Sequence, residues 1–113
     1  MKITKVNTVE STLSNKDHPY MHGAWETFYD EFNATNLDVI GEIPKDLEGV
    51  YISNTENQVH EPLGRFHPFD GDGMLHSITF QNGSADYRNR FIQTDGFQVE
   101  QKFKKSKWAG LMA

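Results

Sequence analysis

The sequence contains no cysteine, which excludes a disulfide framework, a zinc–thiolate site and a cysteine nucleophile. Basic residues are not in excess either. Lys and Arg number 11 against 16 Asp and Glu, so the formal net charge is −5 at pH 7. Because binding to phosphates needs a basic patch, we expect no nucleic-acid partner.

Long hydrophobic runs are also missing. No stretch approaches the roughly 20 apolar residues that a transmembrane helix needs. Residues 1–7 are mostly polar and lack the apolar region of a secretory signal. Together with the absence of cysteine, these features favour a cytoplasmic protein. The hydrophobic fraction of 36% is low for a self-sufficient core, whereas the aromatic fraction of 12% indicates that some side chains are buried.

The clearest structural signal lies in the second half of the chain. Residues 70–73 read Asp-Gly-Asp-Gly, which is typical of a tight turn. Residues 73–81 then alternate like a strand, and Asn82-Gly83 follows. Because Asn and Gly both tolerate positive φ, this pair is a strong hairpin signal. We predict an antiparallel hairpin of strands 73–81 and 85–94.

Two further strands are predicted upstream. Residues 37–40 and 50–52 are rich in β-branched and aromatic side chains and flank a turn that contains proline. Residues 54–64 form a polar segment that predicts a loop. With the hairpin, these strands make an antiparallel meander of four.

The two ends of the chain give weaker signals. Residues 1–16 are polar and without period, which predicts a mobile arm. Residues 17–36 carry aromatic side chains at helical spacing, so either a short amphipathic helix or an extended segment is consistent with them. Residues 99–108 predict a helix or a connecting segment.

Three motifs carry a family resemblance. They are EIPKDLEGVYISNTENQ (42–58), EPLGRFHPFDGDGMLHSITF (61–80) and ADYRNRFIQTDGF (85–97), and they resemble the opening of a carotenoid cleavage oxygenase. The likeness extends from DHPYMHGAW, which begins at residue 17, to the last residue. One departure lies at residues 53–58, where the Arg and Pro of the family's turn are missing.

The resemblance implies an all-β fold, the N-terminal segment and first blade of a seven-bladed β-propeller. We expect an arm over 1–16 and a partial propeller over 17–113, with the blade at about 37–97. The resemblance also favours the extended interpretation of 17–36. Complete members of the family are several times longer, so we expect this chain to be an N-terminal fragment.

The resemblance further implies a non-haem iron(II) dioxygenase. Such an enzyme uses O2 to cleave a C=C double bond in a carotenoid, an apocarotenoid or a stilbene-like compound. Its Fe(2+) is held by four histidines from later blades. We therefore expect no catalytic, cofactor-binding or metal-binding residue in these 113 residues, and no activity of the chain alone. The alternatives are a non-catalytic binding or assembly module and an inactive remnant.

The five histidines do not form a metal-ligand pattern. His76 alternates with apolar residues on the inner face of the hairpin, so we expect a structural histidine that is hydrogen-bonded within the blade. His67 lies nine residues away across a turn. The remaining three lie in predicted loops, where we expect exposed or capping side chains: His18, His22 and His60.

The charged residues of the hairpin have structural interpretations. A calcium loop that starts at Asp70 would need an oxygen ligand at its fifth position and Glu at its twelfth, where Met74 and Gln81 stand. A turn capped by the aspartates is favoured instead. Two arginines on one strand face are expected to pair with acidic residues rather than to bind an anion, and Arg65 is expected to anchor the acidic turn. The arginines are Arg88 and Arg90, and their candidate partners are Asp70, Asp72 and Asp86.

The C-terminal segment combines lysines with apolar residues. Peripheral contact with an anionic membrane and a solvated linker both fit this composition, and the short apolar stretch favours the linker. The lysines are Lys102, Lys104, Lys105 and Lys107, followed by Trp108.

Overall fold

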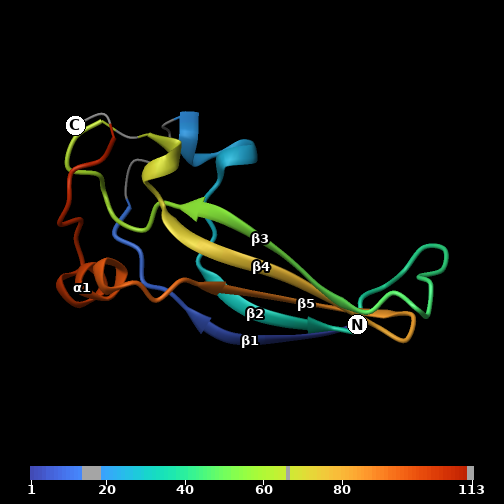
Figure 1. Cartoon of the computed structure of the whole chain (residues 1–113). Helices are drawn as coiled ribbons and strands as arrows, with labels where there is room; N and C mark the ends of the chain where they lie inside the picture. Colours follow the sequence, from blue (N-terminus) through green and yellow to red (C-terminus); the bar gives the residue numbers. More distant parts are fainter. Residues whose placement is uncertain (14–18, 66, 112–113) are drawn as a thin grey trace.

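The computed structural model describes residues 1–13, 19–65 and 67–111. They form one five-stranded antiparallel sheet with strand order β1-β2-β5-β4-β3 and a helix at one end (Figure 1). The strands are β1 (Lys2–Thr8), β2 (Asp30–Thr35), β3 (Gly49–Asn57), β4 (Asp72–Gln81) and β5 (Ser84–Phe91). The helices are α1 (Asp95–Phe103) and the 3-10 turns η1 (Pro19–Met21), η2 (Gly23–Trp25) and η3 (Pro68–Asp70).

The predicted hairpin is confirmed. β5 pairs over its whole length with residues 74–81 of β4, and Asn82 and Gly83 take φ values of 50° and 79° between the two strands. This positive-φ pair matches the right-handed twist of the strands. β5 ends at Phe91 rather than at residue 94, because Thr94 accepts a hydrogen bond from Phe97 N at 3.0 Å and caps α1. The helix therefore begins before the predicted segment 99–108.

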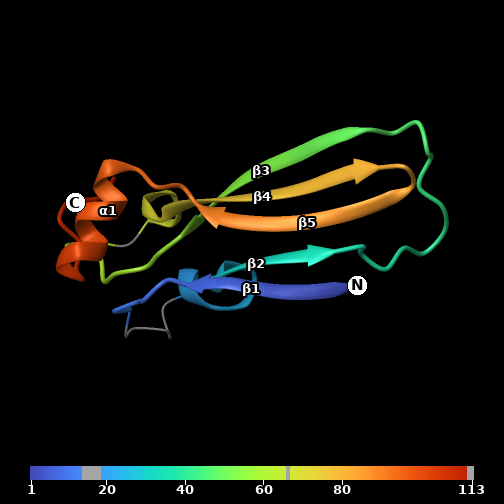
Figure 2. The same cartoon turned by 90° about the horizontal axis from the view of Figure 1, so that it is seen from below.

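The prediction of a strand at residues 37–40 is wrong. β2 ends earlier, and Asn36 leaves the strand with a φ of 53°. The following segment crosses to the other edge of the sheet as an irregular loop, which lies beside the β4–β5 turn (Figure 2). Val39 and Ile40 are exposed there, so their β propensity finds no partner to pack against.

The prediction of an arm over residues 1–16 is wrong for Lys2–Thr8, which form β1 and pair with β2. Every residue of β1 is exposed, so this strand shows no alternation that sequence analysis could detect. The predicted loop at 54–64 is also wrong in its first part, because β3 continues to Asn57. For residues 17–36 the extended interpretation is confirmed at β2, whereas 14–18 lie outside the described residues.

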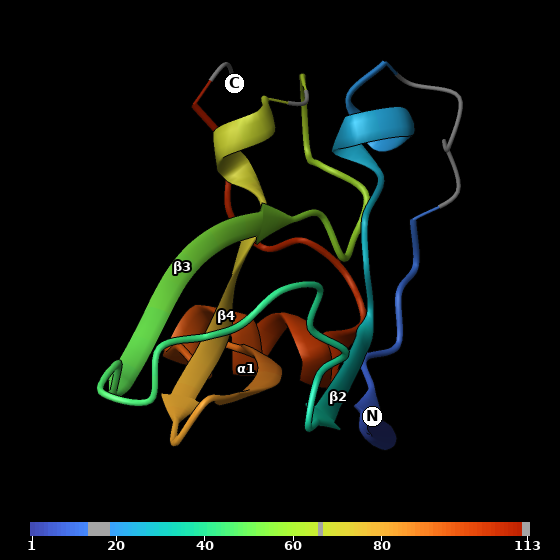
Figure 3. The same ribbon diagram turned by 90° about the vertical axis from the view of Figure 1, so that its right-hand side faces the viewer.

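The core lies at the end of the sheet where α1 packs. It consists of Val9, Val59, Met74, Phe91 and Phe97, with Tyr29 packed against it. The Phe91 and Phe97 rings stack with centroids 5.3 Å apart, which fastens the helix to the sheet. α1 lies at the end of the strands in Figures 1 and 2, and in the view along the strands it appears behind β4 (Figure 3).

Candidate functional site

His76 is hydrogen-bonded within the sheet, as predicted. Its Nε2 lies 2.8 Å from Thr55 Oγ1 on β3, and its Nδ1 lies 2.5 Å from the Tyr87 hydroxyl on β5. Thr55, His76 and Tyr87 lie on the neighbouring strands β3, β4 and β5, so the His76 ring links all three strands. Burial lowers the pKa of His76, which favours the neutral ring at neutral pH.

His60 is buried, and the prediction of an exposed or capping side chain is wrong for it. The residue is 2% exposed. Its Nδ1 lies 2.8 Å from Thr12 Oγ1 and its Nε2 lies 3.1 Å from Gln101 Nε2 on α1. Burial lowers the pKa of His60, against the opposing charges of Glu100 and Glu10. The sequence around His60 gives no sign of burial, because the residue lies in a polar loop. The side chains that bind its ring come from distant segments, Thr12 and Gln101.

Of the remaining histidines, His67 caps a helical turn and His22 is exposed. His67 caps η3, because its Nδ1 accepts a hydrogen bond from Phe69 N at 3.1 Å. His22 is exposed and its side chain makes no capping hydrogen bond to η2. His18 lies outside the described residues.

These residues do not fit an iron site. Both ring nitrogens of His60 and of His76 are engaged by protein side chains. Over residues 1–13, 19–65 and 67–111, no group of three or more His, Asp and Glu side chains is arranged to hold a metal ion. A set of ligands for iron would therefore need residues from elsewhere.

The predicted pairing of the hairpin arginines with aspartates is wrong for the residues that the structure describes. Arg90 instead donates from Nη2 to Asn33 Oδ1 at 2.7 Å and from Nη1 to Phe32 O at 3.3 Å, so it binds β2. Neither Arg88 nor Arg65 forms an ion pair within this part of the chain.

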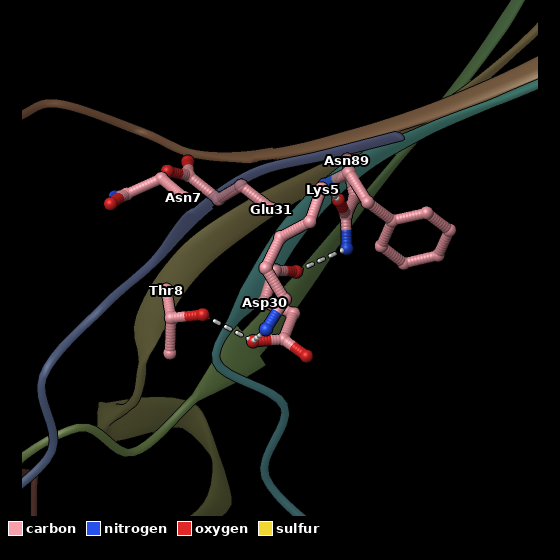
Figure 4. A network of polar contacts seen from close by, with 7 residues as sticks. Lys5, Asn7, Thr8, Asp30, Glu31 and Asn89 are labelled. Atoms are coloured by element: carbon pink, nitrogen blue, oxygen red, sulfur yellow. Dashed lines mark hydrogen bonds and ion pairs between the residues drawn. The ribbon is translucent and has the colours of Figure 1, made fainter. Parts of the chain in front are cut away.

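A polar network joins β1, β2 and β5 (Figure 4). The buried Glu31 carboxylate accepts hydrogen bonds from Asn7 Nδ2 at 3.0 Å and from Phe91 N at 2.8 Å. At the edge of the network, Asp30 Oδ1 accepts from Thr8 Oγ1 at 2.6 Å and lies 3.6 Å from Lys5 Nζ. The contacts tie strands together, and we assign them a structural role.

One aspartate of the acidic turn caps a backbone amide, as predicted, but the amide belongs to a distant segment. Asp70 Oδ1 accepts a hydrogen bond from Leu111 N at 2.8 Å. Burial and, second, the charge of Glu100 raise the pKa of Asp72 to about 6, although the Val59 backbone favours the charged form. The turn therefore holds the C-terminal segment at one end of the sheet through Asp70.

A cavity of about 190 Å³ lies beside this turn. Its walls come from the loop after β3, the acidic turn, α1 and the C-terminal segment. The lining residues are Gln58, Pro62, Leu63, Asp70, Asp72, Glu100, Ser106, Trp108, Ala109 and Gly110. The aspartates stand out in the sequence but the cavity does not, because Glu100 and the C-terminal wall up to Gly110 lie 30 to 40 residues after Asp70.

The C-terminal lysines lie among exposed aromatic side chains. Lys107 Nζ lies 4.2 Å from the centre of the Phe103 ring, and Lys104 Nζ lies 3.4 Å from Glu10 Oε2. Trp108 is exposed as well. No helix among the described residues has the length and apolar character to cross a membrane.

Comparisons with known proteins agree with this fold. The sequence pattern of the retinal pigment epithelial membrane protein family matches residues 25–113. A probable chloroplastic carotenoid cleavage dioxygenase 4 from Arabidopsis thaliana is 42% identical over 74 residues, which cover 65% of this chain and 12% of that protein. Carotenoid 9,10(9',10')-cleavage dioxygenase 1 from Pisum sativum is 33% identical over 96 residues, which cover 84% of this chain and 18% of that protein.

A solved structure supports the same assignment. The crystal structure of Pseudomonas brassicacearum lignostilbene dioxygenase superposes with a TM-score of 0.77 at 25% identity, over 84% of this chain and 20% of that one. The chain thus spans less than a fifth of the two curated relatives named above. The all-β prediction is confirmed, and the sheet is the N-terminal segment and first blade of a propeller. This chain belongs to the retinal pigment epithelial membrane protein family, that of the carotenoid cleavage oxygenases.

Proposed function

We propose that this chain is the opening part of a non-haem iron(II) dioxygenase. The complete protein would use O2 to cleave a C=C double bond in a carotenoid, an apocarotenoid or a stilbene-like compound. The observation that carries the proposal is the family match over residues 25–113. The relatives named above include dioxygenases of carotenoids and of a lignostilbene, which supports this range of substrates.

The iron and the reaction belong, in this proposal, to residues outside the chain. The histidines of the described part are committed to hydrogen bonds or caps, or lie apart on the surface, and do not fit the metal. When bound by its own ligands, iron(II) would supply the activation of O2. The part played by these 113 residues is to form a blade on which the rest of the propeller packs.

The first test is the mass of the native protein in its source cells, detected with an antibody against residues 64–93. We expect a product several times heavier than the 13.0 kDa of this chain. A product of 13.0 kDa would contradict the proposal.

A second test incubates the purified chain with Fe(2+), O2 and a carotenoid or stilbene-like substrate. We expect no cleavage, and iron-dependent product from the chain alone would show that its ligands are present after all.

Location is a further part of the proposal. We propose a cytoplasmic protein that contacts membranes peripherally through its C-terminal segment. The cluster of Lys107, Phe103 and exposed Trp108 supports this, because basic and aromatic side chains together favour anionic lipid surfaces. Sedimentation with anionic vesicles but not with neutral ones is the expected result, and equal recovery with both would contradict it.

A second candidate is a non-catalytic assembly module. β3 is an edge strand with three consecutive exposed apolar residues, Val50, Tyr51 and Ile52. An open apolar edge of this kind is a template for pairing with another strand. Light scattering decides this point, since oligomers that grow with protein concentration are expected for a module and a constant monomer mass contradicts it.

A further inference from the structure

The cavity beside the acidic turn is rich in hydrogen-bond acceptors. Gln58 is 7% exposed, and its Nε2 donates to His60 O, which leaves Oε1 as the free end of the amide. Gln58 Oε1 and Asp70 Oδ2 are the two buried side-chain polar atoms of the described residues that lack a partner. Both residues line this cavity. A buried acceptor without a donor is costly, so a ligand whose N–H donors reach either oxygen is favoured.

The same wall carries negative charge, and the hydrogen bonds that Asp70 accepts from Leu111 N and Glu100 from Lys107 N come from uncharged backbone amides. Asp70, Asp72 and Glu100 line the cavity. Within residues 1–13, 19–65 and 67–111, none of them forms an ion pair with a lysine or arginine. Burial is the main cause of the raised pKa of Asp72, and the negative charge of Glu100 adds to it.

The rest of the lining is apolar and includes an aromatic ring. Pro62, Leu63 and Ala109 supply aliphatic surface, and Trp108 supplies an indole. Indole rings attract organic cations, and aliphatic walls suit the methylene stem of a long basic side chain. An inorganic ion suits this wall less well, and no three acidic side chains of the described chain converge as metal ligands.

We propose that this cavity binds the cationic end of an arginine or lysine side chain presented by another polypeptide segment. The guanidinium or ammonium group is attracted by the negative charge of the lining carboxylates and lies against Trp108, while the stem follows Leu63 and Pro62. The volume of about 190 Å³ is sufficient. An apolar cavity of about 150 Å³ accommodates benzene, which is larger than a guanidinium group.

The test adds short peptides to the 113-residue chain and follows the Trp108 indole N–H and the Asp72 carboxyl by NMR. The probes are acetyl-Gly-Arg-Gly-amide and the same peptide with citrulline, a neutral isostere of arginine. We expect the arginine peptide to shift the Trp108 signal saturably and to lower the pKa of Asp72 from about 6. The citrulline peptide is expected to do neither.

Variants separate the cavity from the rest of the surface. Trp108→Leu removes the ring and is expected to weaken binding by about threefold to tenfold. Trp25→Leu is the matched control, since Trp25 is 50% exposed against 55% for Trp108 and does not line the cavity. Glu100→Gln is expected to weaken binding, whereas Glu48→Gln, on an exposed loop, leaves it unchanged.

Four results would overturn the proposal. The first is the absence of any shift at about 10 mM peptide, a concentration that saturates a site with a Kd of about 1 mM. The second is equal binding of the arginine and citrulline peptides. The third is a response to Ca²⁺ at matched ionic strength without a response to the peptide, which would identify an inorganic cation site. The fourth is binding of free arginine amide but not of the peptide, which would identify a small-molecule site.

Discussion

The backbone amide of Phe32 on β2 donates its hydrogen bond to the side chain of Asn89 on β5 rather than to the backbone of that strand. Asn89 Oδ1 accepts a hydrogen bond from Phe32 N at 2.7 Å, and Asn89 Nδ2 donates to Asp30 O at 3.0 Å. Backbone pairing between these strands covers only Asn33–Arg88 and Ala34–Tyr87. Asn89 is therefore the bridge at the point where β2 and β5 separate, as the contact in Figure 4 shows.

Replacement of Asn89 by Leu is expected to destabilise the chain by about 2–4 kcal/mol. The residue is 1% exposed, and its loss leaves the part-buried Phe32 amide and Asp30 carbonyl without these partners, at about 1–3 kcal/mol each. Urea unfolding followed by circular dichroism measures the change. Gln98→Ala, on the exposed side of α1, is the control and is expected to stay within about 0.5 kcal/mol. Equal stability of the two variants would show that Asn89 is not a bridge.

His60 makes the stability of the chain depend on pH below its ordinary pKa of 6.5. Because burial lowers its pKa in the folded chain, the unfolded chain binds more protons between that lowered value and 6.5. The free energy of unfolding therefore falls as pH drops through this window, and His60 contributes no further change below the folded pKa. His60→Gln is expected to remove part of this loss.

Urea unfolding at about pH 7, 6 and 5 tests the role of His60 by comparing each variant with the parent chain. His22→Gln provides the control, since that side chain is exposed and makes no capping hydrogen bond. His76 contributes with the same sign in all three proteins and cancels in the comparison. Parallel pH profiles of the parent chain and His60→Gln would contradict the prediction.

Asp72 acts with the opposite sign. Its pKa rises from 3.8 to about 6 in the folded chain, so the folded chain binds more protons between these values. Its contribution to stability therefore increases as pH falls from about 6 to 3.8. Asp72→Asn keeps a side-chain oxygen at this position and removes the charge. We expect it to stabilise the chain by roughly 1–2 kcal/mol at pH 7, with a gain that disappears toward pH 4.

Thermal unfolding at several pH values measures the effect of Asp72→Asn. Asp38→Asn is its control, because the Asp38 side chain is 86% exposed and its removal changes no buried charge. Destabilisation by Asp72→Asn at neutral pH would mean that the charged carboxylate is favoured in the folded chain.

The β4–β5 turn needs glycine for conformational reasons. Gly83→Ala places a side chain at a φ of 79° and is expected to cost about 1 kcal/mol. Gly96→Ala is the informative comparison, since Gly96 lies in α1 and a new Cβ would meet its nearest neighbour at 3.6 Å. It is expected to be neutral or stabilising by up to about 1 kcal/mol. Only Gly83→Ala should therefore destabilise the chain, and equal destabilisation by both variants would contradict this reasoning.

Local patterns explain which elements were predictable. Asn82-Gly83 specifies its turn through the φ preferences of two residues, and β4 and β5 follow from alternation on either side of it. β1 could not be predicted, because it is exposed throughout and shows no alternation. Residues 37–40 show the reverse case, a strand-like sequence that forms no strand. Their apolar side chains are exposed and have no surface of the sheet to pack against.

The sequence by itself determined the absence of thiol chemistry, the central hairpin and the family to which the motifs belong. Only the tertiary structure decided the environments of its titratable groups. His60 is covered by Thr12, 48 residues earlier, and by Gln101, 41 residues later. Asp72 has its pKa raised by burial and by Glu100 on α1. Turn and strand preferences act over a few neighbouring residues, whereas burial and charge depend on segments that only the folded chain brings together.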